Sequence, residues 1–263
     1  MASLRNPFFM EELIKMLIDQ GAIEAHGPCS ERWTLHPQKL LAAHVPPTLT
    51  GVLQARLDGL PTPEKAALQQ ASIIGHVFWD RVLAALDERA AELLPTLVRR
   101  KLTLPRAAAV IKGLREYAFR HQLLHQVTYD TVLKRTRREL HGKVARWLSV
   151  LTGSRANDFL GITAEHYEKA GDAANAAEYH TRAAEDARQR FAHAAVLEHV
   201  QRALAMIDNM PGHDTAVLRW RLLDGREQTH DMQGRRGEQR AFCVVAWQTL
   251  AACAAGSGRP PPQ

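Results

Sequence analysis

The sequence predicts a mainly α-helical protein with one small β hairpin. Helix start and stop residues recur along the first hundred positions, and a short stretch near residues 102–120 alternates apolar and polar residues as strands do. Beyond residue 158 the chain is rich in alanine and internally repetitive. We therefore expect an N-terminal helical fragment, then a winged-helix-like module that contains the hairpin, then a tetratricopeptide-like α-solenoid.

The first helix is predicted over residues 6–21. Asn6 suits the N-cap, Pro7 the first helical position and Gly21 the left-handed stop. Its apolar face carries Phe9, Leu13, Met16 and Leu17. A polar loop from His26 to Pro37 should follow, so that residues 1–44 form a helical fragment and a linker.

Residues 45–152 are predicted to form the winged-helix-like module. A helix opened by Pro46 and Pro47 ends near Gly59, and another starts at Thr62-Pro63-Glu64. Further helices are expected over 79–86 and 91–100, followed by strands near 102–104 and 116–120 that close a loose hairpin. Helices crowded before one hairpin are typical of a winged helix, and two more helices, near 123–133 and 140–151, complete the module.

Residues 153–253 have a sequence pattern that is typical of stacked helical repeats. Small and large residues surround the turn Gly171-Asp172 with tetratricopeptide-like spacing, in the order Ala164, Tyr167, Ala176, Tyr179 and Ala183. Weaker matches to the same spacing follow at Val196, Val200 and Ala203 and around Gly234. Residues 254–263 are expected to be an unstructured tail.

Composition excludes several classes of protein. The 263 residues are 46% apolar and 24% charged, as in ordinary globular proteins, and no apolar run approaches the roughly 20 residues of a membrane-spanning helix. Cys29, Cys243 and Cys253 are too far apart for a CxxC redox or zinc pair, and so few cysteines fit the reducing cytoplasm. Five tryptophans, spread along the modules, are expected to be core anchors rather than platforms for stacked bases.

The net charge of +6 comes from one segment. Residues 112–146 hold nine Lys or Arg against three Asp or Glu, whereas the rest of the chain has 25 of each. A basic patch beside a winged helix invites a DNA-binding hypothesis. However, residues 134–138 follow the hairpin by a full helix, and the apolar Leu140, Val144 and Leu148 predict that they are the solvated face of an amphipathic helix.

Five short motifs occur in one order, and together they resemble the region after the nucleotide-binding core of bacterial STAND ATPases. These are large signalling ATPases that are often joined to adenylate or guanylate cyclase or transcription-factor domains and followed by tetratricopeptide repeats. The resemblance covers roughly residues 4–250 and implies that residues 1–44 are a helical lid fragment with its linker. The motifs are NPFFMEEL (6–13), VPPTL (45–49), ARLDGLP (55–61), ASIIG (71–75) and FRHQLL (119–124).

The resemblance implies two nucleotide-binding residues, each of which acts only together with an ATPase core. Pro7 would pack near the adenine, although Arg5 stands where glycine is usual, and His121 would contact the β-phosphate of ADP, although Gln122 stands where an acid is common. ATP or ADP with Mg²⁺ would therefore be the ligand of the whole ATPase, and the implied partners of this chain are a protein or peptide on the repeats and the core itself.

The P-loop itself is absent from the sequence. Phosphate binding by such a loop needs the pattern GxxxxGK[ST], and no such run occurs in the 263 residues. We therefore expect the chain to be the C-terminal portion of a split or truncated signalling ATPase, with a regulatory role, no cofactor and no enzymatic activity of its own. The alternative is a transcriptional regulator that contacts DNA through the winged helix and the basic helix 134–146.

Other candidate chemistries are disfavoured. His121 and His125 lie four residues apart, but Gln122 replaces the glutamate of an HExxH zinc site, so we expect no metal. The alternative role for His121 is that of a partly buried structural residue between a strand and a helix. The acidic pair Glu11 and Glu12 is expected on an exposed helix face, and no catalytic residues can be assigned.

Overall fold

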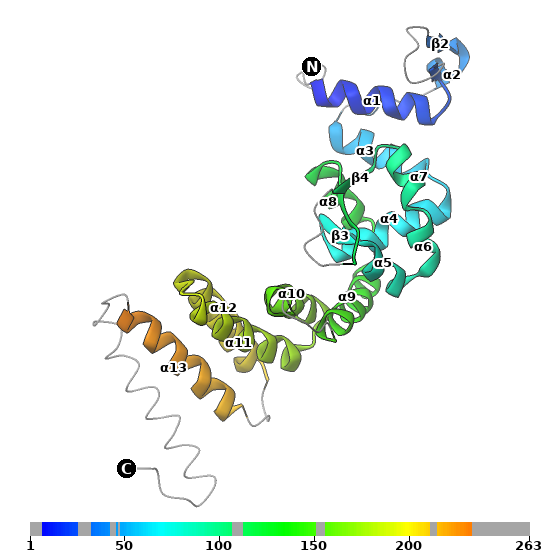
Figure 1. The fold of residues 1–263 in the computed structure, drawn as a ribbon. Helices are drawn as coiled ribbons and strands as arrows, with labels where there is room; N and C mark the ends of the chain where they lie inside the picture. The colour runs from blue at the N-terminus through cyan, green and yellow to red at the C-terminus, as the bar shows by residue number, and fades with distance from the viewer. Residues whose placement is uncertain are drawn as a thin grey trace, which may run out of the picture. The chain divides into compact units, whose positions relative to one another are not determined.

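The computed structural model describes residues 7–25, 33–42, 46, 48–106, 113–150, 156–210 and 215–232 (Figure 1). The chain divides into two compact units, Met1–Thr136 and Arg137–Gln263, which we call the N-terminal and C-terminal units. The predicted fold class is confirmed, because both units are built mainly from helices and the strands form small antiparallel hairpins.

The first helix agrees with its predicted end signals. Helix α1 (Pro7–Asp19) is followed by Gly21 at φ +68°, the left-handed conformation expected of the stop residue. The predicted polar loop instead contributes to a hairpin of β1 (Ile23–Ala25) and β2 (Trp33–Leu35), with α2 (Pro37–Ala42) after it. Strands of three residues are too short for an alternating pattern to reveal them.

Helices α3 (Leu49–Asp58) and α4 (Thr62–Ile74) occupy the predicted positions. Thr48 caps α3 by accepting a hydrogen bond from the backbone N–H of Gly51 at 3.1 Å. Helix α1 packs on α3 through a buried apolar cluster that includes Phe9, Met16 and Val52. Helix α1 therefore belongs to the same unit as α3 and α4.

The remainder of the N-terminal unit contains the helices and the hairpin that were predicted for residues 45–152. Helix α4 leads into β3 (Val77–Trp79), α5 (Asp80–Leu86), α6 (Glu88–Glu92), α7 (Leu94–Arg99), β4 (Thr103–Arg106), β5 (Glu116–Phe119) and α8 (Gln122–Asp130). The predicted hairpin is β4–β5, and β3 adds a third antiparallel strand, in the order β3-β5-β4. The predicted helix over 91–100 is divided at Leu93, because Pro95 lies in the first turn of α7.

The C-terminal unit consists of consecutive packed helices. They are α9 (Lys134–Ser149), whose first three residues precede the division, then the 3₁₀ turn η2 (Ala156–Phe159), α10 (Leu160–Ala170), α11 (Ala173–Gln189), α12 (His193–Asp208) and α13 (Ala216–Met232). The division at Thr136 falls before the expected boundary near residue 152, because Ala145 of α9 packs with Tyr167 and Ala176. The expected match around Gly234 and the tail 254–263 lie outside the described residues.

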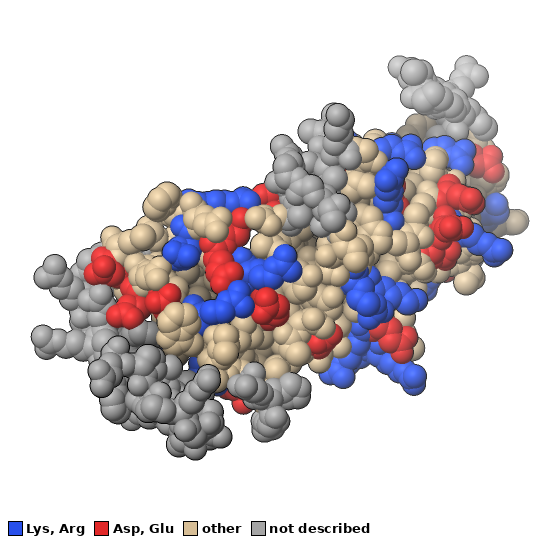
Figure 2. All heavy atoms as spheres, turned by 60° about the horizontal axis from the view of Figure 1, so that its bottom comes forward, with Lys and Arg blue, Asp and Glu red and all other residues tan. Residues whose placement is uncertain are grey.

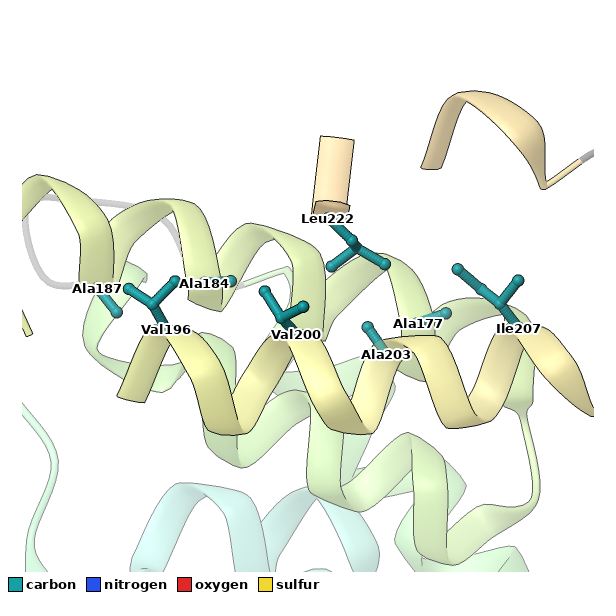
Figure 3. Packing of buried hydrophobic residues seen from close by; sticks show 8 residues of the cluster. All are labelled: Ala177, Ala184, Ala187, Val196, Val200, Ala203, Ile207 and Leu222. Carbon is teal, nitrogen blue, oxygen red and sulfur yellow. The ribbon is translucent and has the colours of Figure 1, made fainter. Parts of the chain in front are cut away.

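Small residues allow close packing in this unit. Figure 3 shows Val196, Val200, Ala203 and Ile207 of α12 directed toward α11, with Leu222 of α13 lying over them. The facing residues of α11 are Ala177, Ala184 and Ala187. Alanine on one helix faces branched side chains on the next, so the two helices can approach closely.

Candidate functional site

The two residues that the sequence singles out for a nucleotide lie at the ends of secondary structure elements. Pro7 is the exposed first residue of α1. His121 follows β5 and is the extended N-cap residue of α8, at φ −142° and ψ 142°. Proline at the start of a helix costs no hydrogen bond, and an extended N-cap residue directs the chain from the sheet into the helix.

The structure brings the two motifs together. Phe8, which follows Pro7, lies edge-on against the imidazole of His121, with 4.1 Å between the ring centroids. Arg120, next to His121, lies 3.6 Å from the carboxylate of Glu11 in α1. The first turn of α1 and the end of β5 therefore form one corner of the N-terminal unit, which we call the α1–His121 corner.

The imidazole of His121 is held in a neutral form by its surroundings. Its pKa lies below the ordinary value, chiefly because burial opposes the charged form. The carboxylate of Glu12, 3.8 Å from Nε2, raises the pKa, whereas Lys15 and Arg120 lower it. A neutral imidazole of this kind can make one hydrogen bond to an anion, beside the positive end of the α1 dipole.

A buried ion-pair network lies beneath this corner. Arg56 of α3 donates to Glu12 of α1, and the two residues are 3% and 1% exposed. The same guanidinium contacts Asp19 at 3.1 Å, and Lys15 contacts Glu12 at 2.7 Å. Because Glu12 and Arg56 are desolvated, each depends on the other, and their contact fixes α1 on α3.

The network continues to the end of α7 and the start of α4. Arg56 also donates to the backbone carbonyl of Arg100 at 3.1 Å, directly after α7. Arg100 in turn contacts Glu64 at the start of α4, at 2.6 Å. Helix α1 is thus connected through charged groups to α3, to the end of α7 and to the start of α4.

The expectation that Glu11 and Glu12 share an exposed face is wrong for Glu12. Glu11 is exposed, but Glu12 is buried against Arg56. The sequence contains a signal for this arrangement, because Glu12 lies three residues from Phe9 and Arg56 lies three from Leu53, within the two apolar faces. A charged residue inside an apolar face indicates a buried partner.

His125 belongs to the sheet side of α8 and not to a site with His121. Its Nε2 lies 3.0 Å from the backbone carbonyl of Ser72, and its ring packs on Phe119 with 5.1 Å between centroids. Among the residues that the structure describes, no group of three His, Cys, Asp or Glu side chains could hold a metal ion.

The basic residues of segment 134–146 lie on α9. Lys134, Arg135 and Arg138 are exposed, while Val144 and Leu148 are buried, so the predicted amphipathic helix is confirmed. On the face drawn in Figure 2, basic side chains lie interspersed with acidic ones. None of the described helices combines the length and apolar character that crossing a bilayer requires.

Comparison with known proteins gives one relative. Uncharacterized protein R02095 of Rhizobium meliloti (strain 1021) is 26% identical over 173 residues, or 63% of this chain. The chain spans only 16% of the length of that protein. No family model matches the sequence, and no solved structure matches it.

Proposed function

We propose that this chain is the regulatory, protein-interaction segment of a STAND-type signalling ATPase in the cytoplasm. In this proposal the C-terminal unit binds a protein or peptide, and the α1–His121 corner responds to the nucleotide state of an ATPase core encoded outside these residues. The observation that carries the proposal is the contact of Phe8 with His121, because it joins the start of the lid to the Phe-Arg-His motif.

The geometry of the corner suits a role beside a bound phosphate. The neutral imidazole of His121 supplies one hydrogen bond, and the first turn of α1 supplies partial positive charge. Pro7 is exposed on that same turn, where an adenine could pack on it. These groups offer too few contacts to hold a nucleotide alone, so ATP or ADP with Mg²⁺ would bind only with the core.

The ion-pair network gives the corner a means of transmitting movement. A displacement of α1 would break or carry along the contacts of Arg56 with Glu12 and Asp19. Desolvated pairs tolerate little stretching, so α1 and α3 should move as one body. The long relative from Rhizobium meliloti supports a segment that works within a much larger polypeptide.

The test uses the chain joined to the coding sequence that precedes it in the genome. We expect that sequence to contain GxxxxGK[ST] and the joined protein to retain ADP through purification, measured by chromatography of the released nucleotide. His121→Ala should reduce the retained ADP at least about tenfold, since it removes a charge-assisted contact. His193→Ala, in α12 of the C-terminal unit, is the control and should retain ADP; full retention by His121→Ala would contradict the proposal.

A DNA-binding regulator is the second candidate, favoured by the exposed Lys134, Arg135 and Arg138 of α9. Fluorescence anisotropy with labelled duplex DNA separates the two functions. A DNA complex should weaken steeply between about 50 and 200 mM salt, and the triple change of these residues to Gln should reduce that slope by roughly three. Absence of binding at 50 mM salt would eliminate this candidate.

A further inference from the structure

Four histidines of the C-terminal unit form two pairs, and each pair joins two consecutive helices. His141 of α9 and His166 of α10 face each other with 2.8 Å between their Nδ1 atoms. His180 of α11 and His199 of α12 do the same at 3.1 Å. The same contact therefore occurs at two helix interfaces of one unit.

The pairs lie largely out of solvent. His141, His166 and His180 are buried, and His199 is half-buried. In each pair one ring must donate from Nδ1–H while the other accepts at an unprotonated Nδ1. A doubly protonated pair would bring two N–H groups and two positive charges face to face, so it cannot keep this geometry.

We propose that the C-terminal unit is an acid-sensitive helical stack, in which the two imidazole pairs hold α9 to α10 and α11 to α12 at neutral pH and release them on protonation. This inference concerns the regulation of the unit and does not depend on the ATPase proposal, because it uses only contacts within residues 137–208.

Two cations and the partner imidazole oppose a charge on His141 of the first pair. Lys169 of α10 and Arg137 of α9 both oppose a charge on His141, as does His166. Together with burial, which is the largest cause, they lower the pKa of His141 to about 3. Burial and these neighbours oppose the first proton on this pair, and a second proton requires the helices to separate, because it removes the Nδ1 acceptor.

The second pair has both positive and negative neighbours. Glu168 of α10 lies 3.4 Å from Nε2 of His180 and favours its charged form, while Arg202 of α12 opposes it. Glu198 and Glu165 favour a charge on His199, which Arg202 again opposes. Burial still dominates and lowers the pKa of both rings. Because carboxylates offset part of that cost, the α11–α12 pair should protonate before the α9–α10 pair as pH falls.

Lowering the pH should favour an open state of the stack, in which the paired helices have separated. The separated histidines have a pKa of about 6.5 and the paired ones have lower values, so the open state binds more protons below pH 6.5. The closed stack is therefore fully favoured above pH 6.5 and loses stability as the pH falls. For His141 alone, the equilibrium constant for opening should rise about 30-fold by pH 5.

Hydrogen exchange of the whole chain, followed by mass spectrometry at pH 7.5 and 5.0, measures this opening. After correction for the intrinsic exchange rate, protection of peptides from α9 to α12 should fall by about 30-fold or more at pH 5.0. A fall of less than about threefold would overturn the proposal, whatever the variants do.

Paired substitutions assign the effect to the imidazoles. His141→Leu with His166→Leu keeps an apolar contact of similar volume that cannot titrate, and the pH dependence of α9 and α10 should nearly vanish. His180→Leu with His199→Leu is the independent second test, for α11 and α12. His193→Leu, at the start of α12 and outside both pairs, should behave as the unchanged protein. Unchanged pH dependence in both double variants would disprove the proposal.

Discussion

Arg56 donates a hydrogen bond to Glu12, which lies 44 residues away in the sequence, and each of the two side chains is 1% exposed. The contact joins α3 to the helix that begins at Pro7. Neither residue has access to water that could replace its partner, so the stability of the α1–His121 corner depends on both charges being present together.

Replacing Arg56 by Met should therefore destabilise the N-terminal unit by about 3–5 kcal/mol, because buried Glu12 loses its guanidinium partner and keeps Lys15 as a cation beside it. Urea denaturation, followed by circular dichroism, measures the loss. The matched control is Lys65→Met, which removes the exposed pair of Lys65 with Asp58 and should cost at most about 1 kcal/mol. Equal effects of the two substitutions would show that the buried network has no special role.

A second variant separates the charge from the packing. Glu12→Gln combined with Arg56→Met removes both members of the pair, so neither buried charge is left without the other. The double variant should recover at least about 1 kcal/mol relative to Arg56→Met alone. A double variant less stable than the single one would mean that packing of the Arg56 side chain dominates.

The parts of the fold that could be predicted have strong local signals. Helix α1 is marked by Pro7 and Gly21, and the hairpin β4–β5 by alternation around Leu104 and Tyr117. Strand β3 could not be predicted, because Val77-Phe78-Trp79 is short and wholly apolar and becomes a strand only when β5 lies beside it. Tertiary contact, which a local pattern does not contain, decided that element.

The candidate site could be predicted only in part, because some of its contacts join residues that are far apart in the sequence. The resemblance singled out Pro7 and His121, and the structure places their neighbourhood in one corner, but the partners Glu12 and Arg56 depend on long-range pairing.

The expectation for the tryptophans is wrong at two positions. Trp79 is buried, whereas Trp33 and Trp220 are half exposed, and Trp247 lies outside the described residues.

Substitution by alanine should change the stability of the C-terminal unit in opposite directions at two glycines. Gly171 ends α10 in the left-handed conformation at φ +82°, so Gly171→Ala should destabilise the unit by about 1 kcal/mol, although no atom blocks the new methyl group. Gly225 lies inside α13 with open space around it, and Gly225→Ala should stabilise by up to about 1 kcal/mol. Thermal unfolding measures both, and a shift of the same sign would contradict the backbone argument.

The core between α11 and α12 should be sensitive to small losses of volume. Val200 is 1% exposed and points toward Ala184 and its neighbours (Figure 3), so Val200→Ala should cost about 2 kcal/mol. Val217 at the start of α13 is 71% exposed, and the same change there should cost less than about 0.5 kcal/mol. Chemical denaturation compares the pair, and a cost at Val217 as large as that at Val200 would refute this assignment of the core.

The titration of His121 should depend on Lys15. Lys15 lowers the pKa of His121, so Lys15→Met should raise that pKa toward its ordinary value, while Lys39→Met, at the exposed α2, should leave it unchanged. The Cε1–H signal of His121 in an NMR titration reports the pKa directly. Because the folded pKa lies below 6.5, His121 contributes stability above pH 6.5 that is lost as the pH falls, and Lys15→Met should reduce that loss. A pKa of His121 that falls or stays constant in Lys15→Met would show that burial alone sets the charge state of this corner.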